Sequence, residues 1–241
     1  MLNDKQRHLI GSFLDEEDKL ERVSTYEELQ RISCRYDSQV KLAEGAFKVI
    51  SEVLDEASGR PVAMARLKNT NSLQREKFLR EARITASLQH PNIIPVYDIG
   101  IDSAGEAFFT MKLIRGESLE SLLKNNKLSK VERLEIFIKI CDAVSYAHSR
   151  GIIHQDLKPE NIQISAYGEV LVCDWGLARI DNDCRNELVE RYLFDAVDKE
   201  SMTLDGMVKG TPGYLSPEQT GSSEKRDCRT DIYSLGAILF R

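Results

Sequence analysis

The sequence predicts an α+β fold in which a β-rich segment is followed by a mainly helical one. Short apolar runs of strand length lie between residues 35 and 114 and are separated by turn residues. Longer, helix-like patterns follow Gly116. The chain has 241 residues, which is enough to bury a sizeable core in one domain or in two small lobes.

Three segments follow from these patterns: a helical extension at 1–34, a β-rich lobe at 35–114 and a helical lobe at 115–241. The extension is acidic, and the stretch from Thr25 to Glu28 fits a capping box that opens a helix. We interpret the extension as helices packed on the neighbouring lobe. A regulatory or dimerising element is the alternative.

The β-rich lobe is expected to contain several strands and one helix. Residues 40–50 have the shape of strand, turn and strand, and residues 61–68 form the next strand. Apolar residues recur with helical spacing over 72–89. Strands at 93–101 and 107–114 complete the lobe.

The helical lobe is expected to contain a long core helix. A capping box at Ser129 and Glu132 opens this helix, which runs to about Arg150. Its inward face is predicted to carry Val131, Leu134, Ile138, Cys141 and Val144.

A polar loop at 154–161 lies between apolar runs that are too short for helices and suit buried strands. The loop brings together a carboxylate, a lysine and an amide, on Asp156, Lys158 and Asn161. A second acid, Asp174, follows the apolar run at 170–173. Phosphoryl transfer needs such a set: an acceptor that orients the attacking hydroxyl, a cation beside the moving phosphoryl group and oxygens for magnesium.

The loop, together with the motif Asp174-Trp175-Gly176, resembles the catalytic loop and the magnesium-binding motif of eukaryotic-type, bacterial-like serine/threonine protein kinases. Residues 210–218 (GTPGYLSPE) resemble the end of the activation segment of these kinases. That closing stretch argues against a small-molecule phosphotransferase of similar fold. The resemblance implies a two-lobed protein-kinase-like fold that uses ATP and Mg²⁺.

The resemblance also assigns roles to single residues. Asp156 would accept or orient the proton of the substrate hydroxyl, and Lys158 would lie beside the γ-phosphate. Asn161 and Asp174 would hold magnesium, which needs few protein ligands because phosphates and water supply the others. Thr211 would contact the catalytic loop and favour serine or threonine acceptors.

The phosphate-binding part of the chain departs from the family pattern. The glycine-rich turn keeps only Gly45, because Ala43 and Lys48 occupy two other glycine positions. In the strand at 61–68, Ala65 stands where the family has a lysine that pairs with the ATP phosphates.

Lys48 is expected to replace the missing lysine. Side chains alternate between the two faces of a strand, so Lys48 shares a face with Ile50, which in the family lies over adenine. This arrangement resembles the with-no-lysine kinases. Glu81, on the helix at 72–89, is expected to tether the lysine. The alternatives are an alanine introduced to abolish activity and a natural pseudokinase.

The resemblance predicts a nucleotide pocket lined by Ala43, Gly45, Lys48, Ile50, Ala63, Met111, Gln163 and the backbone of Leu113. Gln163 replaces an apolar residue beneath adenine, which is expected to loosen nucleotide binding. Gln155 replaces the arginine that in many relatives receives the activation-segment phosphate. Activity is therefore not expected to require that modification.

Asp231 resembles the start of the family's helix F and is expected to brace the catalytic loop. The resemblance covers residues 35–241 and ends within this helix, so the sequence predicts a helical lobe truncated after helix F. Its apolar residues are expected to be covered by a second copy of the chain, by the N-terminal helices or by a separate polypeptide. These residues are Ile232, Leu235, Ile238, Leu239 and Phe240.

Composition narrows the remaining function classes. A net charge of −6 argues against a nucleic-acid partner. No apolar run approaches membrane-spanning length, so no membrane partner is expected. The 5 cysteines lack paired spacing, which indicates reduced thiols and a cytoplasmic location. Two functions remain: transfer of the ATP γ-phosphoryl group to a protein hydroxyl, or a catalytically inactive pseudokinase that binds nucleotide or acts as a scaffold.

Overall fold

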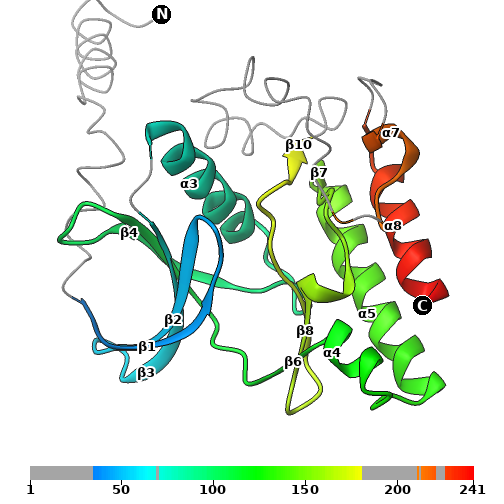
Figure 1. Ribbon diagram of the computed structural model, residues 1–241, viewed down its shortest axis with the longest axis horizontal. Coiled ribbons are helices and arrows are strands. Elements are labelled where there is room, and N and C mark those ends of the chain that lie inside the picture. Colours follow the sequence, from blue (N-terminus) through cyan, green and yellow to red (C-terminus); the bar gives the residue numbers. More distant parts are fainter. Residues whose placement is uncertain (1–34, 69–70, 181–210, 212, 221–225) are drawn as a thin grey trace, which may run out of the picture.

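The computed structural model describes residues 35–68, 71–180, 211, 213–220 and 226–241. Figure 1 shows a β-sheet lobe that carries helix α3, joined to a lobe that contains the long helices α5 and α8. The predicted two-lobed α+β fold is therefore confirmed. The predicted helical extension at 1–34 lies outside the described residues. The lobe boundary at 114 and 115 stays a prediction.

Five antiparallel strands form the sheet of the first lobe, in the order β1-β2-β3-β5-β4. They are β1 (Tyr36–Glu44), β2 (Lys48–Asp55), β3 (Arg60–Leu67), β4 (Val96–Ile101) and β5 (Ala107–Met111). The predicted strand at 93–101 starts later because Pro95 has no N–H to donate to a ladder. The strand predicted at 107–114 ends at Met111, and the next N–H, that of Lys112, donates to the carbonyl of Pro95 just before β4.

Helix α3 (Ser72–Ser87) packs on one face of this sheet (Figure 1). Asn71 caps its start, because the Asn71 side chain accepts a hydrogen bond from the Gln74 N–H at 2.9 Å. Phe78 of α3 lies against Phe109 of β5, with ring centroids 5.0 Å apart. The helix ends slightly before the predicted residue 89, because Leu88 has extended backbone.

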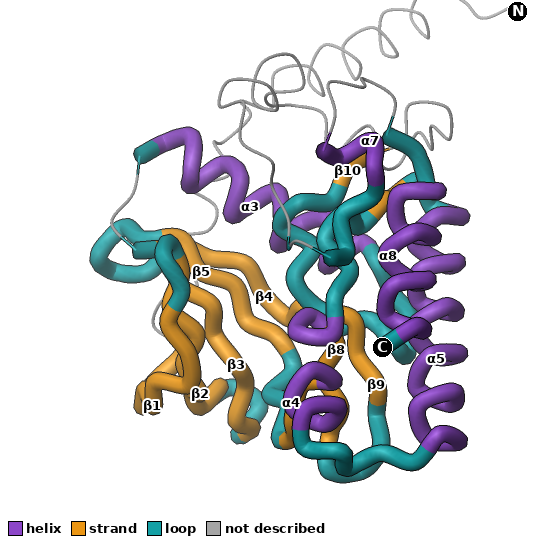
Figure 2. The backbone as a smooth tube through the Cα atoms, turned by 45° about the vertical axis from the view of Figure 1, so that its right-hand side comes forward, coloured by secondary structure: helices purple, strands orange, loops and turns teal. Residues whose placement is uncertain are grey.

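The second lobe combines short strands with two longer helices. Its strands and short helical turns are β6 (Gly116–Ser118), α4 (Leu119–Lys124), β7 (Ile152–Ile153), η2 (Pro159–Asn161), β8 (Ile162–Ser165), β9 (Val170–Val172), β10 (Arg179–Ile180) and α7 (Pro217–Thr220). The longer helices are α5 (Lys130–Ser149) and α8 (Arg229–Phe240), which lie side by side in Figure 2. The predicted capping box of Ser129 and Glu132 opens α5.

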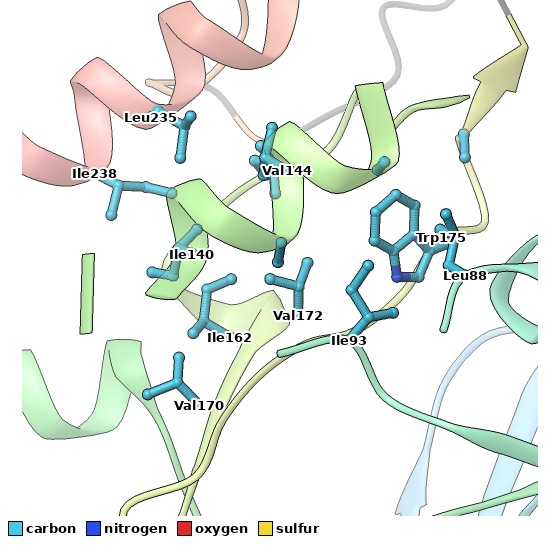
Figure 3. Close-up of a cluster of buried hydrophobic side chains, with 14 of the residues drawn as sticks. Leu88, Ile93, Ile140, Val144, Ile162, Val170, Val172, Trp175, Leu235 and Ile238 are labelled. Carbon is cyan, nitrogen blue, oxygen red and sulfur yellow. The ribbon is translucent and has the colours of Figure 1, made fainter. Parts of the chain in front are cut away.

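One apolar core holds this lobe together (Figure 3). Helix α5 packs against β7 and β9, and α8 packs against α5. The core thereby supports the strands that precede and follow the polar loop at 154–161. The core includes Ile140, Val144, Ile162, Val170, Val172, Trp175, Leu235 and Ile238. Among the described helices, none is both long and apolar enough to cross a bilayer.

The predicted inward face of α5 is largely wrong. Val131, Leu134 and Ile138 are exposed by 65%, 53% and 59%. Cys141 is partly buried, and Val144 is buried as predicted. Helix α5 carries two apolar stripes, and the core contacts the one that includes small residues, which let neighbouring elements approach. The buried stripe is Ile136, Ile140, Ala143, Val144 and Ala147.

The apolar residues of α8 divide in the same way. Leu235 and Ile238 are buried, whereas Ile232, Leu239 and Phe240 are exposed by 54%, 53% and 96%. A groove of about 310 Å³ lies between α4, α5 and α8. We name it the α5–α8 groove, and its lining includes Leu134, Phe137, Ile238, Leu239 and Phe240.

Candidate active site

The polar loop between β7 and η2 is held by a buried carboxylate of α8. Asp231 is fully buried and accepts hydrogen bonds from the backbone N–H groups of His154 and Gln155, both at 2.8 Å. The ring of His148 lies 2.8 Å from the same carboxylate. Gln155 adopts a left-handed backbone with φ of 66°, which the neighbouring bonds must maintain in a residue other than glycine.

Asp156, Lys158, Asn161 and Thr211 form one connected group. The Lys158 ammonium donates to Asp156 Oδ2 at 2.8 Å and to Thr211 Oγ1 at 2.9 Å. Asn161 Nδ2 donates to the Asp156 carbonyl at 2.9 Å and to Asp156 Oδ2 at 3.2 Å. These bonds fix the direction of the Asp156 carboxylate and connect the loop to the segment that contains Thr211.

Asp174 follows β9 in a left-handed backbone conformation, with φ of 61°. The next residue, Trp175, is 1% exposed, and its ring lies 4.5 Å from that of His154 (Figure 3 shows Trp175 in the core). A side chain at Gly176 would place its Cβ 3.0 Å from Glu81 Oε2. The glycine therefore lets α3 approach the Asp174 turn closely.

Lys48 reaches two of the candidate carboxylates, Glu81 and Asp174. It starts β2, opposite Leu67 of β3, and its ammonium donates to Glu81 Oε1 at 2.7 Å and to Asp174 Oδ1 at 3.2 Å. Ala65 lies opposite Ile50 and is 1% exposed, packed in the core that β3 shares with α3. The ammonium that pairs with Glu81 and Asp174 therefore comes from β2 and not from β3.

The Lys48 ammonium bonds two carboxylates, and this pairing shifts the pKa of all three groups. Burial alone would lower the pKa of Lys48, but Glu81 and Asp174 outweigh it and raise the pKa. Burial raises the pKa of Glu81, against the effect of Lys48. Burial also opposes ionisation of Asp174, but Lys48 prevails and the pKa of Asp174 is lowered. The pKa is therefore lowered at the more exposed acid, Asp174, and raised at the more buried acid, Glu81.

The turn that precedes Lys48 is tied to the end of β3 by Lys68. The Lys68 ammonium donates to the Gly45 carbonyl at 2.8 Å and to the Glu44 carboxylate, and the Lys68 N–H donates to the Phe47 carbonyl at 2.9 Å. Glu44 also accepts from Lys41, and these two lysines lower the pKa of Glu44 to about 2. The Glu44 carboxylate therefore stays charged and bonded near neutral pH.

The remaining predicted pocket residues form a less connected set. Ala63 is buried opposite Met111 of β5, while Ala43 and Gly45 are exposed at the β1–β2 turn. Met111 and Leu113 are partly buried. Gln163 Nε2 donates to the Glu160 carbonyl at 3.3 Å. These residues make none of the ion pairs that join Lys48, Glu81 and Asp174.

The residues present fit a magnesium site shared with phosphate oxygens. The Cys173 N–H donates to the Asn161 carbonyl at 2.8 Å, so Asn161, just before β8, lies beside the end of β9 that leads into Asp174. Both Asn161 bonds to Asp156 use Nδ2, so the amide oxygen is the atom left for a cation. The described residues contain no group of three His, Cys, Asp or Glu that would form a complete metal cage by itself.

Sequence reasoning missed two contacts of this site. One is the link from Lys68 to the Gly45 carbonyl. The other is a bond from the Gln219 side chain to the Gln155 carbonyl at 2.7 Å. Neither Lys68 nor Gln219 belongs to a periodic pattern, and only the positive charge of Lys68 near the predicted phosphate-binding turn offered a signal.

Comparison with known proteins identifies the class. The protein kinase domain model matches residues 36–241, so the chain belongs to the protein kinase family, and the predicted membership is confirmed. Serine/threonine-protein kinase PknD of Chlamydia trachomatis serovar D is 38% identical over 231 residues, which cover 86% of this chain and 24% of the relative. PknD of Protochlamydia amoebophila is 40% identical over 181 residues, covering 69% of this chain and 18% of the relative. The chain spans about a quarter or less of the length of these relatives.

Proposed function

We propose that this chain is a serine/threonine protein kinase that transfers the γ-phosphoryl group of ATP to a protein hydroxyl and uses Lys48 as its phosphate-directed lysine. The observation that carries the proposal is the Lys48 ammonium 2.7 Å from Glu81 and 3.2 Å from Asp174. A cation at that point neutralises nucleotide oxygens that Ala65 does not reach.

Asp156 is the acceptor for the proton of the attacking hydroxyl in this proposal. The hydroxyl oxygen forms a bond to the γ-phosphorus while the bond to the β,γ-bridging oxygen breaks, and that electron pair leaves with ADP. Lys158, 2.8 Å from Asp156, stabilises the charge of the moving phosphoryl group. Asn161 and Asp174 would hold Mg²⁺, which supplies further neutralisation of the phosphate charge.

The preference for serine or threonine rests on Thr211. Its hydroxyl accepts a bond from Lys158 at 2.9 Å, so the segment that receives the substrate is fixed against the catalytic loop. Gln155 provides no guanidinium for an activation-segment phosphate. We infer that the site reaches its working geometry without that phosphate.

A pseudokinase is the second candidate, and one observation favours it. The ammonium of Lys48 already bonds both carboxylates, so a bound metal ion has to compete with Lys48 for Asp174. In this case the fold would bind nucleotide or a partner and signal by its shape. The Asp174 side chain is 45% accessible, so a metal ion could reach the carboxylate that Lys48 now pairs with.

We also propose a cover for the α5–α8 groove and a cytoplasmic location. The exposed residues Leu239 and Phe240 would lie against a second copy of the chain, the N-terminal helices or another polypeptide, since large apolar patches rarely stay in water. The 5 cysteines without paired spacing suit a reducing compartment. A monomer in solution scattering whose α8 exchanges its amide hydrogens rapidly would contradict the cover.

A radiolabelled ATP assay with Mg²⁺ and a generic protein substrate tests the proposed activity. Lys48→Ala and Asp174→Ala are each expected to lower the rate by about 10²–10³, because each removes charge stabilisation from the transferred group. Lys77→Ala, which changes an exposed lysine of α3, is the matched control. Full activity of Lys48→Ala refutes the role of Lys48. A wild-type chain that binds ATP without transfer supports the pseudokinase.

A further inference from the structure

The peptide group before Asp156 is held from both sides by side chains of other elements. Gln155 has a left-handed backbone with φ of 66°. Its N–H donates to Asp231 Oδ1 at 2.8 Å, and its carbonyl accepts from Gln219 Nε2 at 2.7 Å. Such a backbone conformation persists in a residue other than glycine only where its surroundings enforce it. Gln219 and Asp231 together provide that restraint.

The direction of the Gln219 amide is fixed by Ser216. The Ser216 N–H lies 3.1 Å from Gln219 Oε1, and the Ser216 hydroxyl lies 3.2 Å from the same atom. A backbone N–H can only donate, so the amide oxygen must face Ser216 and the amide nitrogen must face the Gln155 carbonyl. Gln155 and Gln219 are each 3% exposed and Ser216 is fully buried, so water does not replace these bonds.

The side chain of Gln155 does not make this connection. Within the described part of the chain, its Nε2 is buried without a hydrogen-bond partner. The link to the segment at 213–220 therefore runs through the main-chain carbonyl of Gln155 and needs no charge at position 155. The same segment's neighbour Thr211 meets the catalytic loop a second time, at Lys158.

We propose that Gln219 is a positioning residue for the phosphoryl transfer. Its amide fixes the peptide that precedes Asp156 and so couples the segment that receives the protein substrate to the direction of the acceptor carboxylate. This coupling runs from the neutral side-chain amide of Gln219 to the main-chain carbonyl of Gln155 and uses neither an arginine nor a phosphate. The inference rests on the proposed kinase function and deepens its regulation.

Two variants of the full chain separate the hydrogen bond from the packing. Gln219→Met keeps the length of the side chain but removes both the donor to Gln155 and the acceptor for Ser216. Gln219→Glu keeps the shape and the acceptor for Ser216 and puts an oxygen opposite the Gln155 carbonyl. Both are expected to lower kcat about tenfold or more at pH 8, with KM for ATP within about twofold of wild type, because the acceptor is misplaced while the nucleotide site is intact. Gln89→Met, at an exposed position, is the control.

The pH dependence of Gln219→Glu gives a readout that packing alone would not move. A protonated carboxyl has an O–H that can donate to the Gln155 carbonyl as the amide does, so its activity relative to wild type is expected to rise as pH falls from 8 to 6. Asp231 and Glu218 nearby favour the protonated form, whereas Arg226, 3.5 Å from the Gln219 carbonyl, opposes it. These groups are common to both proteins, so the ratio isolates position 219.

Hydrogen exchange of the peptide spanning 151–161 completes the test without relying on activity. Faster exchange in Gln219→Met at an unchanged melting temperature of the fold supports the tether. Wild-type kcat in Gln219→Met, or wild-type exchange in both variants, overturns it. If wild type itself transfers no phosphate, the proposed function fails, and the exchange result still decides whether Gln219 holds the loop. If Gln219→Met does not fold, a flat pH ratio for Gln219→Glu overturns the proposal.

Discussion

The Lys48 ammonium lies 2.7 Å from Glu81 Oε1, although Lys48 belongs to β2 and the sheet register puts Ala65 of β3 opposite Ile50. The contact with Glu81 of α3 is therefore made from β2 and not from β3, the strand on which the family pattern has its lysine. Ala65 is packed in the core with Phe109 and α3, so a longer side chain at position 65 would require this core to rearrange.

Restoring the family's lysine is expected to harm the protein. Ala65→Lys adds a long side chain at a site that is 1% exposed and brings a second ammonium to Glu81. We expect a stability loss of about 1–3 kcal/mol and no gain in kcat, measured by urea unfolding and steady-state kinetics. Ala65→Leu separates the effect of size from that of charge. Full activity in the Lys48→Ala/Ala65→Lys double variant would show that the positions are interchangeable.

Lys68 is expected to affect nucleotide binding more than chemistry. Its ammonium holds the Gly45 carbonyl at 2.8 Å, and loss of that bond frees the turn from which Lys48 enters the cleft. Lys68→Ala should raise KM for ATP about three- to tenfold, on the scale of one lost charged hydrogen bond, with kcat nearly unchanged. Lys68→Arg, which retains a donor, should recover most of the affinity. Equal losses in kcat for both variants would refute this role.

The sequence predicted contacts that depend on short-range rules and a family landmark. The direction of Lys48 follows from strand alternation, and Lys48 meets Glu81 as that rule predicts. The capping box at Ser129 is local and was also predicted correctly. The catalytic roles assigned to Lys48 and Glu81 stay predictions.

Other features depend on which surfaces meet in three dimensions. Helix α5 has two apolar stripes of helical period, and periodicity alone does not choose between Leu134, which is exposed, and Ile140, which is buried. The bond between Gln219 and Gln155 joins positions 64 residues apart and leaves no pattern in the sequence. Only the packed lobe brings these amides together.

Acid sensitivity of the first lobe is expected to depend on Asp55. Arg35 donates to both Asp55 oxygens, at 2.5 and 2.6 Å, and lowers the pKa of Asp55 from 3.8 to about 2. An acid whose pKa is lower in the folded state stabilises the fold at pH values above its unfolded pKa. This stabilisation is lost as the pH falls through the folded pKa. The stabilisation should therefore disappear between pH of about 4 and 2.

Asp55→Asn is expected to remove this dependence. The loss at neutral pH should be about 1–2 kcal/mol, less than the full shift implies because the Arg35 side chain is 34% exposed and partly screened. Urea unfolding from pH 6 down to 2.5 measures it. Glu135→Gln, on α5, is the control. Parallel pH curves for Asp55→Asn and wild type would rule out the Arg35 pairing as the source.

Replacing Gly116 or Gly236 with alanine should change the free energy of unfolding in opposite directions. In β6, the Cβ of an alanine at Gly116 would collide with the Ile164 carbonyl oxygen and lie 2.8 Å from Ser165 Cα, and strand backbone cannot move aside as a side chain can. In α8, Gly236 has nothing within 4 Å of the same added atom. We expect Gly116→Ala to lower the free energy of unfolding by about 1–3 kcal/mol, as overpacking does. Gly236→Ala should raise it by about 0.5–1 kcal/mol, because alanine loses less backbone entropy in a helix.

The Gly116 variant should also weaken nucleotide binding, because β6 pairs with β8 and sets Ser118 opposite Gln163 at the floor of the predicted adenine pocket. A collision at Gly116 pushes β6 away from β8 and displaces that floor. Urea unfolding and KM for ATP, measured on both variants, check the two effects together. If Gly116→Ala unfolds at the wild-type midpoint and keeps its KM, the close approach of β6 to Ile164 does not hold this part of the cleft in place.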